Sequence, residues 1–402
     1  MKLKFGNRRV NLSEFLFYCA WGLYSITYLL FMQTEFSKLF QLEKINNYVI
    51  YFSMLLLLMS LLIELKLTVK GLILTFGFVI VILLLELNRT GNVFSLYLMF
   101  ILCFKQGDIR ELIQFNMKIK LFCFLSTVIL CMLGVIDNYT TLINDSYKQA
   151  LGYLHPNIFG VTAYSLLLDW LYLRWKKIRL FEWPIIFGLG VITYWVAAAR
   201  AAAYPFFLII ILFVLARYKP IIFKKKWVQY AFVCSTPLLT VLSFGLAYLY
   251  MKEDSFARRI NEMLTGRLSF AVRYLTDYGF SIFGQNIKSI STRTARAMGV
   301  SSEILDMSYI RAPITYGIIF STFILIAFMV LEKKSFNNAN VGLAIFILYY
   351  IAVGFAETYM LIPTFNVTMV LSLNVLRESW EKQKYMEKIN VRKKGLFTFQ
   401  RE

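Results

Sequence analysis

The segment from Lys252 to Ser308 is a long polar stretch in an apolar chain, and it holds eight Lys or Arg residues and six acids. A basic segment of this length beside apolar segments is suited to holding an anionic, membrane-bound substrate. Arg200 lies outside it, within a run of alanines from 197 to 203. A cation among methyl groups is costly near hydrocarbon, so Arg200 is expected either to bind an anion or to reach the membrane surface.

Within the polar segment, the apolar residues follow the spacing of one face of a helix from 256 to 274. On this helix Arg267 falls inside the apolar face, so it is expected to point toward the bundle and to bind a buried anion. Arg258, Arg259 and Arg273 fall on the opposite arc, where solvated charge is the simpler interpretation, with Arg273 as a supporting ligand. Gly266 is the position at which such a helix would break.

Other charged residues have a structural and a functional interpretation. Asp306 and Ser308 precede an apolar span, where either could cap the helix, and a cap is at least as plausible as a catalyst. Arg311 and Glu357 are expected to form an ion pair with each other. His155 precedes Pro156 at a helix start, on the same face as Arg200, so both a surface position and a functional role stay open. Asp169 is expected to be structural.

Composition predicts the fold class, because 59% of the 402 residues are hydrophobic and the mean hydropathy is +0.62. The sequence predicts an all-α, polytopic integral membrane protein with one helical bundle over residues 1–376 and a basic tail over 377–402. The first apolar run lacks a small-residue cleavage site and is expected to remain as a helix. The predicted spans are 13–33, 47–64, 69–86, 92–105, 119–137, 157–174, 180–198, 202–218, 228–251, 309–331, 340–357 and 360–377.

Charge predicts the orientation of these twelve spans. Most of the 43 Lys and Arg residues lie at the start of the chain, in alternate connections between spans and in the tail. The positive-inside rule therefore places both termini in the cytoplasm, and the segment 252–308, between the ninth and tenth spans, outside it. Topology and attraction to anionic lipid account for the net charge of +20, so no nucleic-acid partner is predicted.

Neither a metal nor another cofactor is predicted. The five cysteines lie in apolar spans without the spacing of a metal or redox site, and the chain has one histidine. No glycine-rich phosphate loop is present in the cytoplasmic connections. Any chemistry must therefore use carboxylates, arginines and hydroxyls.

Several motifs in order give the chain a family resemblance. They are His155-Pro156-Asn157-x-x-Gly160, Arg200 before a short span, Leu264-Thr265-Gly266-Arg267 in the long loop, and Asp306-x-x-Tyr309 followed by Gly317. With about twelve spans, this order resembles the O-antigen polymerase (Wzy-type) family and the wider O-antigen ligase superfamily. The motifs cover residues 150–320. The chain departs from the family at Arg200, whose neighbours are both alanine where the family usually has hydroxyl residues.

The resemblance implies an enzyme of a bacterial cytoplasmic membrane that polymerises an O-antigen, capsule or exopolysaccharide. Its donor and acceptor would be polyprenyl-diphosphate-linked oligosaccharides, joined at the outer face by metal-independent glycosyl transfer. Arg200 and Arg267, supported by Arg273, would bind the diphosphate and stabilise the charge that develops as it leaves. Asp306, His155 and Glu357, in that order, are candidates to activate the acceptor hydroxyl. Membrane lipid, a chain-length regulator and a flippase would be partners.

Three alternatives stay open. A ligase that moves finished glycan onto another acceptor shares these features. A flippase or other transporter is expected to have a polar central cavity and charged residues at the midplane of several spans, which this sequence lacks. A purely structural membrane protein is the remaining alternative.

Overall fold

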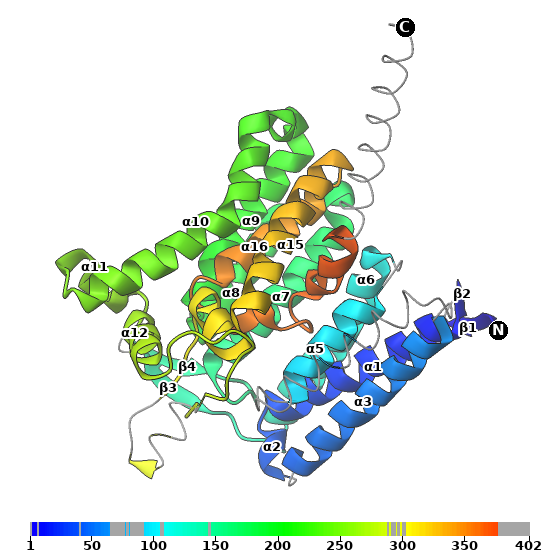
Figure 1. Cartoon of the computed structure of the whole chain (residues 1–402), viewed down its shortest axis with the longest axis horizontal. Helices are drawn as coiled ribbons and strands as arrows, with labels where there is room; N and C mark the ends of the chain where they lie inside the picture. The colour runs from blue at the N-terminus through cyan, green and yellow to red at the C-terminus, as the bar shows by residue number, and fades with distance from the viewer. Residues whose placement is uncertain are drawn as a thin grey trace, which may run out of the picture.

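The structure is a computed structural model of a helical bundle (Figure 1). It describes residues 2–5, 8–39, 42–64, 92–104, 108–143, 146–287 and 303–376, together with residues 77, 80, 289, 290, 295, 298 and 299. The predicted span at 69–86, apart from residues 77 and 80, half of the polar segment after 290, and the tail at 377–402 lie outside the described residues.

The N-terminal part of the chain forms one group of packed helices. Its elements are β1 (Lys2–Phe5), β2 (Arg8–Asn11), α1 (Leu12–Ile26), the π-helical η1 (Thr27–Met32), α2 (Phe36–Leu39), α3 (Leu42–Glu64), α5 (Asn92–Cys103) and α6 (Ile109–Met132). β1 and β2 pair antiparallel, with Lys2 opposite Asn11. Asn11 then caps α1, because its side chain accepts a hydrogen bond from the backbone N–H of Glu14 at 2.7 Å. α3 packs along α1.

A second group of helices follows, joined to the first by the contact between α6 and α7. Its elements are β3 (Thr140–Ile143), β4 (Ser146–Gln149), α7 (Pro156–Arg174), η2 (Trp175–Lys177), α8 (Glu182–Ala197), α9 (Arg200–Tyr218), η3 (Pro220–Lys224), α10 (Lys226–Met251), α11 (Ser255–Met263), α12 (Arg267–Asp277), α14 (Ser308–Arg311), the π-helical η4 (Ala312–Tyr316), α15 (Ile318–Asn337), α16 (Val341–Val353), η5 (Thr358–Leu361) and η6 (Val367–Leu371). β3 and β4 form an antiparallel hairpin.

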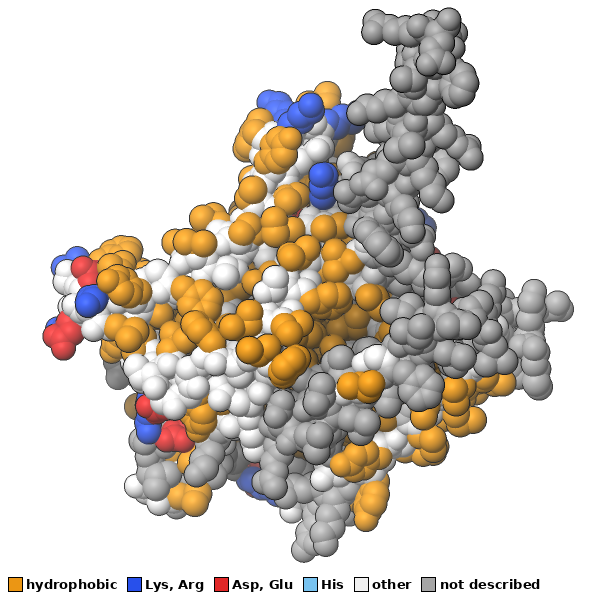
Figure 2. All heavy atoms as spheres, viewed as in Figure 1, with side chains coloured by type: hydrophobic (Ala, Val, Ile, Leu, Met, Phe, Trp, Pro, Cys, Tyr) orange, Lys and Arg blue, Asp and Glu red, His pale blue; other side chains and the backbone are white. Residues whose placement is uncertain are grey.

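The helices confirm the coarse prediction of a membrane-embedded helical protein. Within the described residues, five helical segments are long and apolar enough to cross a membrane: Leu12–Met32, Ile45–Ile63, Ile109–Met132, Arg200–Tyr218 and Lys226–Met251. Shorter apolar helices include Glu182–Ala197 and Val341–Val353. Apolar side chains also cover much of the outer surface (Figure 2). Such a surface suits lipid rather than water.

Successive long helices of the second group run in alternating directions, so their connections lie at two opposite ends of the bundle (Figure 1). The end where α7 meets α8, α9 meets α10 and α15 meets α16 is called the basic end. Figure 2 shows Lys and Arg side chains there. The other end, called the site end, holds the β3–β4 hairpin, the turn from α8 to α9, and helices α11 and α12.

Within the described residues, the predicted span at 360–377 is not one continuous helix: its first part is irregular and buried, and an apolar helical segment begins at Val367 and reaches Leu376. After α16 the backbone forms the two short 3-10 helices η5 and η6. Side chains of α6 satisfy its carbonyl groups: Asn116 donates to the oxygen of Thr364 at 2.9 Å, and Lys120 donates to that of Phe365 at 3.4 Å. Irregular backbone is tolerated in a membrane protein where protein groups satisfy it in this way.

Two other predicted helices are interrupted. The span at 309–331 breaks at Gly317, whose φ is +92° and whose missing side chain admits the carbonyl oxygen of Ile282 and the N–H of Gly284. The helix predicted from 256 to 274 breaks between α11 and α12, at Gly266, whose φ is +83°. Gly266 is thus the break that the sequence indicated.

A buried ion pair joins the two helix groups. Lys120 of α6 donates to Asp169 of α7 at 2.9 Å, and neither side chain is exposed. This buried pair fits the structural role that the sequence predicts for Asp169. Glu332 of α15 is also fully buried, and neither carboxyl oxygen has a hydrogen-bond partner among the described residues.

Candidate active site

The candidate site begins at the break between α11 and α12, which turns Arg267 toward the bundle. Arg267 is the first residue of α12, and its side chain is 17% exposed. The prediction of an inward Arg267 is confirmed, although its premise of one continuous helix is wrong. Phe256 and Met263, placed on the inward face by that premise, are 58% and 71% exposed.

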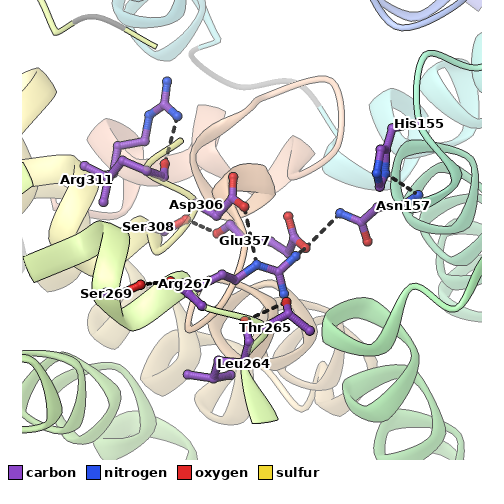
Figure 3. Close-up of polar contacts among 12 residues, drawn as sticks. His155, Asn157, Leu264, Thr265, Arg267, Ser269, Asp306, Ser308, Arg311 and Glu357 are labelled. Carbon is purple, nitrogen blue, oxygen red and sulfur yellow. Dashed lines mark hydrogen bonds and ion pairs between the residues drawn. The ribbon is translucent and has the colours of Figure 1, made fainter. Parts of the chain in front are cut away.

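Arg267 lies between two carboxylates contributed by distant parts of the chain (Figure 3). Its Nη2 lies 2.5 Å from Oε1 of Glu357, and its Nε lies 3.3 Å from Oδ2 of Asp306. The Glu357 side chain is 3% exposed, whereas that of Asp306 is 27% exposed. Glu357 therefore anchors the guanidinium from inside, and Asp306 is the carboxylate that a substrate can approach.

Glu357 is held in place by groups from two further elements. Asn157, in the first turn of α7, donates from Nδ2 to Oε1 of Glu357 at 2.9 Å. The hydroxyl of Ser308, the first residue of α14, donates to the backbone oxygen of Glu357 at 2.5 Å. The predicted helix cap at Asp306 or Ser308 is wrong, because α14 has no side-chain cap. Both residues instead serve this cluster.

The pKa values of the cluster reflect burial and close charges. Burial raises the pKa of the Glu357 carboxyl to about 7. The negative charge of Asp306 also raises this pKa, whereas the positive charge of Arg267 lowers it. Burial acts to lower the pKa of Arg267, but the charges of Glu357 and Asp306 outweigh it and hold that pKa above its ordinary value. Two carboxylates face one guanidinium, so the cluster is net negative, or neutral when Glu357 is protonated.

His155 takes the place that the sequence predicts, at the start of α7. Its Nδ1 accepts a hydrogen bond from the backbone N–H of Asn157 at 3.1 Å, so His155 caps the helix. Asn157, two residues on, is the one that reaches Glu357. Sequence reasoning quoted Asn157 in a motif and gave it no role; its position two residues from a predicted site residue was the signal.

Arg200 also lies at the site end, as the first residue of α9. The turn before it packs directly on α7: a Cβ on Gly160 would lie 2.4 Å from that of Ala199 and 3.2 Å from that of Ala197. The alanine run therefore has a packing role, because larger side chains would separate the helices. Within the described part of the chain, the Arg200 side chain has no carboxylate partner.

Arg273 and Arg311 lie apart from the cluster. Arg273 is 46% exposed and pairs with Glu303 at 2.8 Å and with Asp277 at 3.5 Å. The expected pair of Arg311 with Glu357 is wrong, because Glu357 pairs with Arg267. Arg311 donates from Nη1 to the backbone oxygen of Leu305 at 3.0 Å, and its side chain points away from Arg267 (Figure 3).

Comparison with protein-family models, curated proteins and solved structures finds no significant match to this chain. The resemblance to O-antigen polymerases stays a prediction. Within the described residues, no group of three or more His, Cys, Asp or Glu side chains is arranged to hold a metal ion. The cluster offers a proton acceptor, Asp306, beside a fixed guanidinium, with a second arginine, Arg200, at the same end of the bundle.

Proposed function

We propose that this protein is a membrane glycosyltransferase that joins oligosaccharide units carried on polyprenyl diphosphate. The observation that supports this best is the half-open Asp306 carboxylate, fixed by Arg267 and Glu357 at the end of an apolar bundle. A carboxylate in this position can accept a proton from a sugar hydroxyl. The exposed apolar surface of the bundle suits a substrate whose carrier is a long hydrocarbon chain.

In the proposed reaction, the acceptor hydroxyl oxygen attacks the anomeric carbon of the donor sugar. The bond from that carbon to the diphosphate oxygen breaks, the diphosphate keeps the electron pair, and Asp306 takes the hydroxyl proton. Arg200 faces no carboxylate among the described residues and supplies positive charge for the leaving diphosphate. Arg267 is a positioning residue, because its charge is already matched by Glu357 and Asp306.

The proposed orientation follows from charge. The basic end would face the cytoplasm under the positive-inside rule, and the site end would face outward. The substrates would then be lipid-linked units at the outer face of a bacterial cytoplasmic membrane. Polymerase and ligase differ only in the acceptor, which is a second lipid-linked unit in a polymerase.

A transporter of lipid-linked oligosaccharide is the second candidate, because of one observation. The Lys120–Asp169 pair and Glu332 place charged groups inside the bundle, where they are costly and are often functional. Vesicles that contain the purified protein and a lipid-linked repeat unit separate the two functions. Translocation without a new glycosidic bond would favour the transporter.

The test of the proposed function uses the same purified protein with a polyprenyl-diphosphate-linked repeat unit and no nucleotide. The wild-type protein is expected to produce a ladder of longer glycans. Asp306→Asn should abolish the ladder, because the amide cannot accept the proton. Arg258→Gln is the matched control: Arg258 is exposed, pairs with Glu253 and should be dispensable. A full ladder from Asp306→Asn would refute the assigned role.

A further inference from the structure

Arg311 is a charged residue at the site end that the proposed reaction does not use. Its Nη1 donates to the Leu305 carbonyl, whereas its Nε is buried and has no hydrogen-bond partner among the described residues. No carboxylate there lies within ion-pair distance of it. A buried guanidinium N–H without an acceptor is costly, which makes Arg311 suited to an anionic ligand.

Two tyrosines lie beside Arg311. Tyr28 is close enough to both Arg311 and Tyr316 to interact with them electrostatically. Neither tyrosine hydroxyl has a hydrogen bond to another described residue, and both side chains are partly exposed. The ring of Tyr316 is fixed by stacking on Phe94, with ring centroids 4.5 Å apart. The guanidinium and the two tyrosines thus lie in one part of the molecule, and a phosphate oxygen accepts hydrogen bonds from both kinds of group.

The backbone at this place is unusual on both sides. Tyr28 lies in η1, and Tyr316 ends η4; these are the two π-helical segments in the described part of the chain. π-helical turns are rare, lengthen the helix by extra residues and often occur at functional sites. Here one of them follows α1 and the other follows Arg311, so each carries a residue of the same small group.

We infer that Arg311, Tyr28 and Tyr316 form a binding site for the phosphate oxygens of a lipid carrier, separate from the Arg267–Glu357 cluster. The segment 305–308 lies between them: the carbonyl of Leu305 contacts Arg311, and the side chain of Asp306 contacts Arg267. The proposed phosphate site and the proposed proton acceptor therefore contact neighbouring residues of the same short segment. That the ligand is a polyprenyl diphosphate rests on the proposed function; binding of phosphate oxygens does not.

The experiment measures binding without any glycosyl transfer. Purified full-length protein in nanodiscs of phosphatidylcholine is titrated with polyprenyl diphosphate that carries no sugar, with polyprenol, and with phosphatidylglycerol. Polyprenyl diphosphate is expected to bind to the wild-type protein, and polyprenol at least tenfold more weakly. Arg311→Gln should weaken diphosphate binding at least tenfold, and Tyr28→Phe with Tyr316→Phe severalfold, because charged hydrogen bonds are the stronger ones. Arg258→Gln should bind as the wild type does.

The outcomes separate the two sources of phosphate and the two proposals. Unchanged diphosphate binding by Arg311→Gln, with the variant folded as judged by its melting temperature, would overturn the site. Arg311-dependent binding of phosphatidylglycerol that polyprenyl diphosphate cannot displace would overturn the carrier lipid as ligand. Arg311-dependent diphosphate binding in a protein that forms no glycosidic bond would support this site and reject the proposed function.

Discussion

Replacing Glu357 by glutamine tests the environment of the central carboxylate. Burial raises the pKa of Glu357 from an ordinary 4.5 to about 7, so the folded protein holds this proton more tightly than the unfolded chain. The folded state is therefore most stable, relative to the unfolded state, at a pH below the pKa of the carboxyl in the unfolded chain. It loses this stability as the pH rises to the pKa of the carboxyl in the folded protein. The window therefore runs from about pH 4.5 to about pH 7.

The magnitude follows from the size of the shift. Each pKa unit corresponds to about 1.4 kcal/mol, so Glu357 should cost the wild-type protein about 3 kcal/mol of folding free energy between these two pH values. Glutamine keeps the size of the side chain and an oxygen that accepts from Asn157 and Arg267, but it has no proton to lose. The variant should therefore lack this part of the pH dependence.

Reversible unfolding of both proteins in detergent micelles, followed at pH 5 and at pH 8, measures the difference. The Glu357→Gln variant should gain about 2.5 kcal/mol relative to the wild-type protein on going from pH 5 to pH 8, because part of the change lies below pH 5. Glu262→Gln is the control, since Glu262 is exposed, and its pH dependence should match the wild type. Equal pH dependence for Glu357→Gln and the wild type would refute the raised pKa.

Two further predictions concern packing and the buried ion pair. Lys120→Met leaves the Asp169 carboxylate buried without its cation and should cost about 3 to 5 kcal/mol of folding stability. The double variant Lys120→Met with Asp169→Leu should recover most of this stability. Melting temperatures that fall equally for the single and the double variant would contradict this prediction. Gly160→Ala places a Cβ 2.4 Å from that of Ala199 and should cost about 1 to 3 kcal/mol, relieved by Ala199→Gly. Gly188→Ala, which meets nothing within 4 Å, is its control, and an equal loss of stability there would argue against the contact.

The long apolar helices could be predicted from the sequence. Helices α7, α8, α9 and α10 lie within two residues of the predicted spans, because a continuous apolar run bounded by charged residues has few other structures available. The predicted span at 360–377 is apolar too, yet among its described residues the apolar helix begins only at Val367, and hydropathy cannot show that the backbone before it is irregular. The difference depends on Asn116 and Lys120, which come from a helix far away in sequence.

The site was predicted in part. Arg267, Asp306 and Glu357 were each named as candidates, and the structure brings all three into contact. Their pairing could not be predicted, since local sequence patterns do not show which of two arginines reaches a carboxylate 90 residues away. Without that information, the sequence indicated an ion pair between Arg311 and Glu357. Asn157 was missed because an amide carries no charge to draw attention to it.

The most direct test of the central claim counts the products of the proposed reaction. Purified protein is incubated with a polyprenyl-diphosphate-linked repeat unit, and glycosidic bonds and released polyprenyl diphosphate are both measured by mass spectrometry. Glycosyl transfer predicts one polyprenyl diphosphate for every bond formed with the wild-type protein, and neither product with Asp306→Asn. Wild-type protein that is folded, binds the substrate and yields neither product would contradict the account.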